Sequence, residues 1–205
     1  MTVVSMGPPQ ADIALRETLA LGADKACLLS DRFFAGADSW ATSLTLAKAL
    51  EKLGPFDLII AGEKATDGET GQVGPEVAAI MDLPCSTYVS SVVCDGKCAV
   101  VRRTVEGGIE TQRIKLPCLL TVLNDINEPS MPTLRGKKSA RRASVDTLNA
   151  ADLRLSKEEA GLVGSPTRVV KISHPKISRK TEFYSGRELE RGFERVLEIL
   201  RELAV

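Results

Sequence analysis

Apolar runs alternate with helical stretches through the N-terminal part of the chain. The runs are Thr2–Met6, Lys25–Ser30 and Phe56–Ala61. Each is followed by a stretch in which apolar residues recur every three or four positions, which is the spacing of an amphipathic helix. This alternation predicts an α/β fold with a doubly wound, mostly parallel sheet. The unbroken apolar character of residues 56–61, FDLIIA, is typical of a strand buried on both faces.

The pattern changes after Leu83 and Pro84. Residues 86–123 contain β-rich runs that are separated by the turn signals DG at 95–96 and EGG at 106–108. Such turns favour antiparallel strands, so we expect a β-hairpin insertion in this region. The apolar run Cys118–Leu123 is expected to return to the central sheet.

The C-terminal third is mostly polar. Residues 127–144 contain prolines, a basic cluster and almost no apolar periodicity, which favours an exposed, mobile loop. Residues 150–184 are polar and irregular. Residues 185–203 predict a strong amphipathic helix, with Ser185 and Glu188 as a capping box. Its apolar stripe consists of Leu189, Phe193, Val196, Leu197, Leu200 and Leu203. We expect this helix to be an arm that docks on a partner.

Composition narrows the class of protein. Lysine plus arginine and aspartate plus glutamate both number 27, so net charge predicts no attraction to nucleic acid or to an anionic membrane. No apolar stretch reaches the length of a membrane span, and the first residues do not resemble a signal peptide. The cysteines form an odd set without paired zinc-type spacing, namely Cys27, Cys85, Cys94, Cys98 and Cys118. We therefore expect a reducing, cytoplasmic location.

Residues 62–76, GEKATDGETGQVGPE, form a glycine-rich segment between a predicted strand and a predicted helix. Ligands of α/β proteins bind at this edge of the sheet, where strands end and helices begin. Gly68, Gly71 and Gly74 allow a close approach of the backbone, and Thr66 and Thr70 offer hydroxyl groups. The segment has neither the dinucleotide-binding glycine pattern nor the lysine of a P-loop. From these residues alone, phosphate binding and simple helix capping remain equally open.

Four stretches of the chain together resemble the electron transfer flavoprotein β subunits, in the order typical of that family. They are VVSMGPPQADIALRETLALGADKACLLSD (3–31), FDLIIAGEKATDGETGQVGPEVA (56–78), VEGGIETQRIKLPCLLTV (105–122) and NEPSMPTLRGKKSARR (127–142). The resemblance implies a nucleotide-binding α/β domain over residues 1–128, of the adenine-nucleotide-binding type. It also implies a partner-recognition loop over 129–149 and, over 150–205, a C-terminal helical arm that docks on the α subunit.

The resemblance implies a nucleotide in the glycine-rich segment. In this family the β subunit binds AMP in the plain carriers and a second FAD in the electron-bifurcating ones, beside an α subunit that carries the shuttling flavin. The implied pocket residues are Met6, Gly7, Gly62, Ala65, Thr66, Asp67, Gly68, Glu69, Thr70, Gly71, Gln72 and Val73. Asp67 and Glu69 are expected to bind ribose or to shape the loop. A simple turn-stabilising role for Asp67 is an equal alternative.

The segment DGETGQVGP, with Val73 after the glutamine, is more similar to the FAD-binding, bifurcating group. Membership of that group implies that the FAD accepts a hydride from NADH. One electron then passes to ferredoxin or flavodoxin, and the other passes through the α-subunit flavin to an acyl-CoA dehydrogenase-like partner. The residues of the chain would bind, orient and tune the cofactor.

The resemblance also implies partner-binding residues. Leu134 corresponds to an anchor that enters a pocket of the dehydrogenase, with Arg135, Lys137 and Lys138 as a basic rim. Without the resemblance, a solvated basic linker is the favoured reading of these residues. Arg103 corresponds to an arginine near the region between the flavins. The next position, commonly acidic in the family, is a threonine here, which puts a salt bridge from that position in doubt.

The chain departs from the family at its start. The family pattern includes an earlier strand, a lysine-containing loop and an Asn-Pro segment that have no counterpart here. Without them we expect an exposed apolar sheet edge and fewer nucleotide contacts. Two other functions remain as alternatives: a universal-stress-like module that binds AMP or ATP, and an inactive scaffold subunit. His174 is the single histidine, and we assign it no catalytic role.

Overall fold

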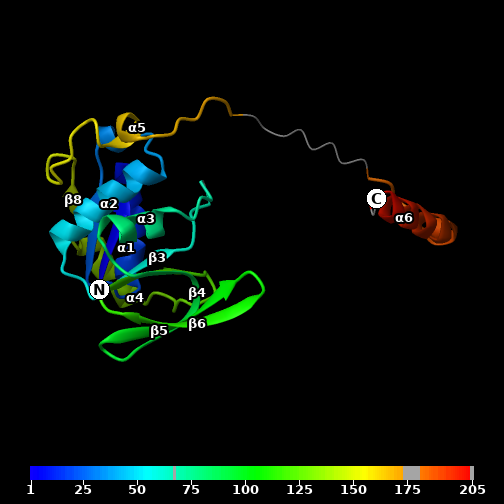
Figure 1. Cartoon of the computed structure of the whole chain (residues 1–205), viewed down its shortest axis with the longest axis horizontal. Coiled ribbons are helices and arrows are strands. Elements are labelled where there is room, and N and C mark those ends of the chain that lie inside the picture. The colour runs from blue at the N-terminus through cyan, green and yellow to red at the C-terminus, as the bar shows by residue number, and fades with distance from the viewer. Residues whose placement is uncertain (67, 173–180, 204–205) are drawn as a thin grey trace. The chain divides into compact units, whose positions relative to one another are not determined.

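A computed structural model of the chain confirms the α/β class that the alternating pattern predicts. It describes residues 1–66, 68–172 and 181–203. The chain divides into two compact units, Met1–Arg168 and Val169–Val205. Both sheets belong to the first unit, in which helices and strands alternate (Figure 1).

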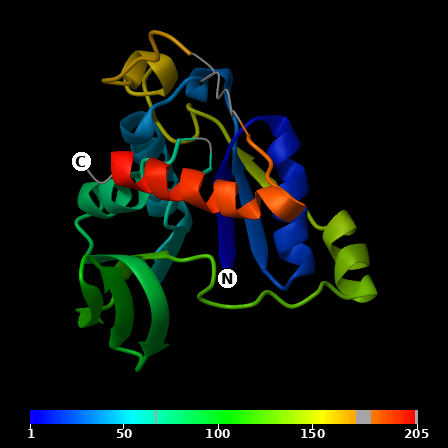
Figure 2. The same ribbon diagram turned by 90° about the vertical axis from the view of Figure 1, so that its right-hand side faces the viewer.

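The first sheet is parallel and has the strand order β1-β2-β8. Its strands are β1 (Thr2–Met6), β2 (Lys25–Leu29) and β8 (Asp146–Leu148). Helix α1 (Asp12–Ala20) covers one face of this sheet, where Leu15 packs against residues of β2 (Figure 2). Gly22, at φ 115°, follows the helix in a backbone conformation that glycine adopts without strain.

The second sheet is mixed and has the order β3-β7-β4-β5-β6. Its strands are β3 (Leu58–Gly62), β4 (Cys85–Cys94), β5 (Cys98–Val105), β6 (Gly108–Lys115) and β7 (Cys118–Val122). β7 is parallel to β3 and β4, whereas β4, β5 and β6 are antiparallel. The predicted hairpins and the return of the apolar run after Leu116 to the sheet are therefore confirmed.

Helix α2 (Ser39–Leu53) connects the two sheets. Its start is capped by Asp38, whose carboxylate accepts a hydrogen bond of 3.1 Å from the Ala41 amide. Leu44 and Ala49 pack in the core of the first sheet, while Ala47 and Leu50 pack against β7 and α3. One helix thus covers a face of both sheets. The remaining helices of the first unit are α3 (Val73–Ile80), α4 (Leu134–Arg142), α5 (Gly161–Gly164), η1 (Pro9–Ala11) and η2 (Arg32–Phe34).

The two-sheet arrangement differs from the single sheet that the pattern predicts. β1 and β3 are each the last strand of their sheet. The prediction that residues 56–61 are buried on both faces is wrong for Ile60, because 56% of its surface is exposed at this edge. Neither β1 nor β3 contains a charged residue.

Two segments that we expected to be irregular are ordered parts of the first unit. Residues 134–142 form the helix α4 rather than a loop, because Thr133 caps the helix through a 3.0 Å hydrogen bond from the Gly136 amide. The segment after β8, expected in the arm, contributes to the core of the first sheet. Its buried residues are Ala150, Leu153, Leu155 and Ala160.

The second unit contains the predicted C-terminal helix. It consists of η3 (Gly186–Glu188) and α6 (Leu189–Leu203). The expected capping box does not form, because the Ser185 side chain makes no cap hydrogen bond and a turn of 3₁₀ helix precedes α6. The predicted stripe is exposed on the helix, apart from Leu203, whose side chain lies outside the described residues. The exposed apolar residues of α6 are Leu189, Phe193, Val196, Leu197, Ile199 and Leu200.

Candidate functional site

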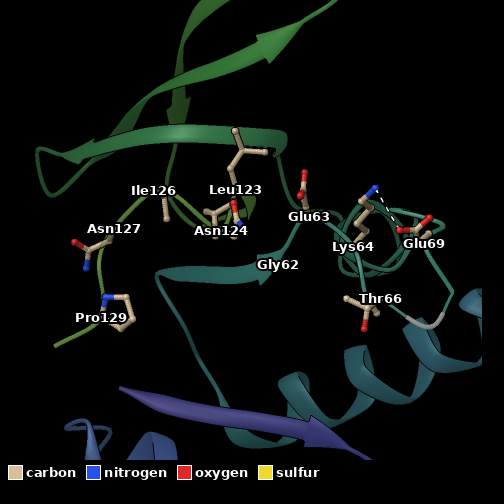
Figure 3. Close-up of a pocket in the computed structure, with 12 residues that line it drawn as sticks. Gly62, Glu63, Lys64, Thr66, Glu69, Leu123, Asn124, Ile126, Asn127 and Pro129 are labelled. Atoms are coloured by element: carbon tan, nitrogen blue, oxygen red, sulfur yellow. Dashed lines mark ion pairs between the residues drawn. The ribbon is translucent and has the colours of Figure 1, made fainter. Parts of the chain in front are cut away.

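A cavity of about 540 Å³ lies at the carboxyl ends of β3 and β7 (Figure 3). The two strands are paired in parallel, with Gly62 opposite Val122, so their following loops leave the sheet side by side. The Glu63 amide donates a 3.0 Å hydrogen bond to the Val122 carbonyl and extends this pairing by one residue. The cavity is lined by Gly62, Glu63, Lys64, Ala65, Thr66, Glu69, Val122, Leu123, Asn124, Ile126, Asn127 and Pro129.

The two sides of the cavity differ in chemistry. The segment after β7 contributes apolar groups, among them Leu123 and Ile126, and the loop after β3 contributes all the charged side chains that line the cavity. Lys64 Nζ lies 3.8 Å from Glu69 Oε1, and Figure 3 shows the two side chains directed toward each other. The Glu69 amide donates to the Ala65 carbonyl at 2.9 Å, which closes a turn in this loop. The site therefore joins an apolar surface to a tight polar loop.

The start of α3 is fixed against α2. Ser39 Oγ lies 3.2 Å from both Gln72 Oε1 and Glu76 Oε1. Buried Ser43 donates a 2.8 Å hydrogen bond to Glu76 Oε2. Because the Gln72 and Glu76 side chains accept hydrogen bonds from α2, the first turn of α3 keeps a defined position beside the loop.

Close packing also fixes the direction in which the loop approaches α3. Gly71 has φ 64°, a left-handed conformation that a side chain would strain. A Cβ on Gly74 would come within 2.3 Å of the Thr121 Cγ2 methyl, so α3 rests directly on β7 at this point. The opposite holds at Gly62, where a Cβ would meet no atom within 4 Å. The loop is thus tightly packed at its helical end and open at its strand end.

The structure brings part of the predicted pocket together. Of the predicted residues, Gly62, Ala65, Thr66 and Glu69 line the cavity. The others on this loop lie farther along it, toward or within α3, and are Gly68, Thr70, Gly71, Gln72 and Val73. Asp67 and His174 lie outside the described residues.

Met6 and Gly7 belong to the other sheet. They stand at the carboxyl end of β1, where the Gly7 amide donates a 3.0 Å hydrogen bond to the Leu29 carbonyl. Neither residue lines the cavity. The structure therefore does not join them to the loop after β3 through that cavity.

Sequence reasoning missed the second side of the cavity. Leu123, Asn124, Ile126, Asn127 and Pro129 follow β7 and line the cavity. The sequence did contain a signal for this side, because the apolar run that ends at Leu123 predicts a strand of the central sheet. Loops after neighbouring parallel strands emerge at the same edge, so residues 123–129 were candidates once β7 was placed beside β3.

Arg103 lies in a second depression of about 400 Å³, which shares Leu123 with the first. Its Nη2 donates to Thr87 Oγ1 at 3.3 Å, and its Nε lies 3.9 Å from Glu110 Oε2. Glu110 stands opposite Arg103 in the register of β5 and β6, so an acidic partner comes from the neighbouring strand instead of position 104. The buried Nε makes no hydrogen bond to any part of the chain that the structure describes.

Apart from Arg103, which belongs to β5, the predicted partner-binding residues lie on α4. Leu134 is the first residue of this helix and is 88% exposed, and Arg135, Lys137 and Lys138 on the following turns are exposed as well. Arg16 of α1 holds the far end of the helix, because its Nη1 donates to the Ala140 and Ala143 carbonyls, both at 2.9 Å. The exposed leucine is therefore presented on a docked helix.

The buried cysteine thiols give little support for nucleophilic catalysis. Burial raises the pKa of the Cys27, Cys85 and Cys118 thiols, which keeps them protonated and poor nucleophiles at neutral pH. Among residues 1–66, 68–172 and 181–203, no cluster of three or more metal-ligating side chains occurs. In the same residues, no helix has both the length and the apolar character needed to cross a membrane.

Comparison with known proteins identifies the family. The sequence model of the electron transfer flavoprotein domain matches residues 1–153, which include both sheets and the cavity. The chain belongs to the electron transfer flavoprotein family. It is 46% identical over 187 residues to the electron transfer flavoprotein subunit beta of Thermoanaerobacterium thermosaccharolyticum. That match covers 91% of this chain and 72% of the relative.

Two further relatives carry other names. The caffeyl-CoA reductase-Etf complex subunit CarD of Acetobacterium woodii is 44% identical over 184 residues, which cover 90% of this chain and 70% of that protein. The protein FixA of Azotobacter vinelandii is 42% identical over 183 residues, which cover 86% of this chain and 65% of that protein. Each match extends beyond residue 153, where the match to the domain ends, because each aligned stretch is longer than the matched domain.

Proposed function

We propose that the chain works as the β subunit of an electron transfer flavoprotein and carries electrons between dehydrogenases and redox acceptors. The family match over residues 1–153 and the 46% identity to a β subunit support this function. The same match argues against the universal-stress-like module. The five free cysteines fit a reducing compartment, and we place the protein in the cytoplasm.

The proposed nucleotide site is the cavity at the ends of β3 and β7. Its volume of about 540 Å³ lies within the range of roughly 300–1,000 Å³ that is common for small-molecule sites. Leu123 and Ile126 offer an apolar surface for an adenine ring, and the loop from Ala65 to Gln72 offers backbone groups for phosphates. The position of this loop before the N-terminus of α3 is the observation that carries the proposal.

The charges of the lining residues set the orientation of the ligand. Glu63 and Glu69 would repel phosphates, and Lys64 offsets part of this charge through its ion pair with Glu69. Phosphates are therefore better placed toward the Thr70 end of the loop, with the base against the residues that follow β7. The open space at Gly62 leaves room for the ligand to approach the backbone there.

We further propose FAD as the nucleotide, with AMP as the alternative ligand. A bound flavin would supply the redox chemistry, and the residues of this chain would bind it, orient it and exclude water. A relative whose name places it in a caffeyl-CoA reductase-Etf complex supports comparison with complexes that reduce acyl-CoA compounds. NADH as donor and ferredoxin as acceptor belong to the same proposal.

The partners follow from two exposed apolar features. The apolar face of α6 is proposed to dock on the α subunit, because an exposed face of this size on a helix is typical of an interaction site. Leu134, surrounded by Arg135, Lys137 and Lys138, is proposed to anchor an acyl-CoA dehydrogenase-like partner. Arg103 is proposed to lie near the path between the flavins.

Co-expression with the α subunit of a relative tests these proposals. The purified complex is denatured, and the released FAD and AMP are separated and counted per heterodimer. Two FAD support the bifurcating form, and one FAD with one AMP supports the plain carrier. A complex that contains neither AMP nor a second FAD contradicts nucleotide binding by this chain, and failure to bind any α subunit contradicts the β-subunit function.

A pair of variants locates the nucleotide. Gly62→Leu fills the open space at the cavity and is expected to lower the nucleotide content of the complex at least about tenfold, because binding sites tolerate a new side chain poorly. Ala79→Leu places the same side chain on an exposed position of α3 and should leave the content unchanged. Equal nucleotide contents in the two variants would place the ligand elsewhere.

A further inference from the structure

Tyr88 has a backbone conformation that a bulky side chain rarely adopts. Its φ angle is 56°, which lies in the left-handed region. In the part of the chain that the structure describes, the other non-glycine residues in this region lie in turns or loops, whereas Tyr88 lies within strand β4. A strained residue persists only where the surrounding structure imposes its conformation, and such residues are concentrated at functional sites.

An irregularity of strand β4 produces this conformation. Between Ser86 and Val89, β4 advances three residues, while the residues opposite them on β7 are only two apart. One residue of β4 is therefore extra, as in a β-bulge. The Tyr88 amide donates a 3.3 Å hydrogen bond to the Thr121 hydroxyl group. Bulges beside binding sites turn a side chain into a direction that a regular strand does not allow.

Burial of the ring does not account for the strain at Tyr88. Its exposed fraction is 42%, whereas Val89, the next residue, is fully buried. Among residues 1–66, 68–172 and 181–203, the Tyr88 hydroxyl group also has no hydrogen-bond partner. The strained position therefore gains little from contacts within the chain, and the hydroxyl group is available to a ligand.

The Tyr88 hydroxyl group lies beside the glycine-rich loop. A Cβ on Gly71 would lie 3.4 Å from the hydroxyl oxygen and 3.5 Å from the Glu63 carbonyl oxygen, so the phenol faces the backbone of the loop. Tyr88 also lines the depression of about 400 Å³ that shares Leu123 with the candidate nucleotide cavity. The Leu123 amide donates a 3.0 Å hydrogen bond to the Val89 carbonyl. Tyr88 is thus fixed between the loop and a wall of the cavity.

We propose that Tyr88 determines the specificity of the nucleotide site through its hydroxyl group, which donates a hydrogen bond to the phosphate of an adenylate ligand beside Gly71. This inference rests on the proposed function, in which the phosphates lie toward the Thr70 end of the loop. Charge alone does not direct a phosphate to this point, because Arg103 and Glu106 of the depression carry opposite charges. A hydroxyl donor supplies direction, and its hydrogen bond to a charged phosphate is a strong one.

The proposed role separates ligands that share the same base. AMP and FAD carry a phosphate on their adenosine part, whereas free adenosine carries none. The Tyr88 hydroxyl group would therefore strengthen the binding of AMP and FAD but not that of adenosine. If the ring only supported the loop, its alteration would affect all three ligands alike.

Titration with AMP and with adenosine tests the proposal. The chain is purified as a complex with the α subunit of a relative, bound nucleotide is removed, and each probe is titrated in a calorimeter. Tyr88→Phe keeps the ring and removes only the hydroxyl group. The affinity for AMP is expected to fall at least about tenfold, and the affinity for adenosine should change less than about twofold.

Tyr184→Phe is the matched control. The Tyr184 hydroxyl group donates a 2.7 Å hydrogen bond to Glu182 in the second unit, outside the proposed site, so this variant should bind both probes as the unchanged chain does. Circular dichroism verifies that both variants fold.

Two outcomes overturn the role of Tyr88 alone. One is an unchanged affinity of Tyr88→Phe for AMP, and the other is an equal loss of affinity for AMP and adenosine, which indicates that the phenol only packs against the loop. A complex of the unchanged chain that binds neither probe overturns the nucleotide site itself, and the role of Tyr88 with it. The failure of this inference is therefore distinguishable from the failure of the proposed function.

Discussion

Gly74 and Thr121 are in direct contact, and a Cβ on Gly74 would lie 2.3 Å from the Thr121 Cγ2 methyl. This contact places the first turn of α3 against β7, on the side of the sheet that α2 also covers. Thr121 also accepts a 3.3 Å hydrogen bond from the Tyr88 amide, at the irregular part of β4. One small residue therefore determines how closely the glycine-rich loop and its helix approach β7.

Gly74→Ala is expected to destabilise the protein by about 1–3 kcal/mol, because the added methyl group overpacks a rigid contact. Urea unfolding followed by circular dichroism measures the change. Gly62→Ala is the control, since its Cβ meets no atom within 4 Å, and it should change stability by less than about 0.5 kcal/mol. Similar unfolding midpoints for both variants would show that the contact at Gly74 relaxes easily.

Arg16→Ala is expected to release α4 from α1. The Arg16 guanidinium donates to the Ala140 and Ala143 carbonyls and also pairs with Asp12 at 2.6 Å. Hydrogen bonds from a charged donor contribute about 1.5–3 kcal/mol, so amide exchange in residues 134–142 should become at least about tenfold faster. Lys48→Ala removes an exposed ion pair to Glu51 and should not change this exchange. Unchanged exchange in Arg16→Ala would mean that packing alone docks α4.

Asp31 is expected to contribute to acid sensitivity. Its carboxylate accepts hydrogen bonds from the Ala150 amide at 3.0 Å and the Phe33 amide at 3.1 Å, which lower its pKa from the ordinary value of 3.8. A lowered pKa in the folded state adds stability above the unfolded pKa, and this stability is lost as pH falls through the folded value. Asp31→Asn should therefore be less stable than the unchanged chain at pH 7, and the difference should shrink toward pH 3. Urea midpoints at the two pH values measure it, and a pH-independent difference contradicts the explanation.

Leu134→Ala is expected to impair partner recognition without affecting the fold. Because the side chain is 88% exposed, the free energy of unfolding should change by less than about 0.5 kcal/mol. Electron transfer from the complex to its dehydrogenase should fall at least about tenfold, as is usual when an anchor of an interface is removed. Val163→Ala removes another exposed apolar side chain, which is 69% exposed, and serves as the control. Equal rates in the two variants would remove Leu134 from the interface.

Local signals allowed much of the fold to be predicted. The turn residues at 95–96 and the apolar run after Leu116 are short-range features, and the structure has the hairpin and the returning strand that they indicate. Helix α4 could not be predicted in this way. Its sequence, LRGKKSARR, lacks an apolar stripe, and the helix depends on the cap at Thr133 and on Arg16, more than a hundred residues earlier.

Only one of the two sides of the candidate site could be predicted from the sequence. The loop after β3 has glycines and hydroxyl residues in a recognisable context, so Gly62, Ala65, Thr66 and Glu69 were predicted to contribute and do line the cavity. The other side depends on which strand lies beside β3. That neighbour, β7, is separated from β3 by the whole hairpin insertion, and only the pairing of Gly62 with Val122 reveals it.

The contacts of α2 with both sheets have a consequence for cooperativity. Within a continuous sheet, backbone hydrogen bonds couple each strand to the next, whereas here the link between β1 and β3 includes the side chains of one helix. The two sheets are therefore suited to unfold locally as separate cooperative units. The packing of α2 against both sheets couples the stability of one sheet to that of the other. A change at Leu46, which packs in both cores, would then alter the thermal unfolding of both sheets together.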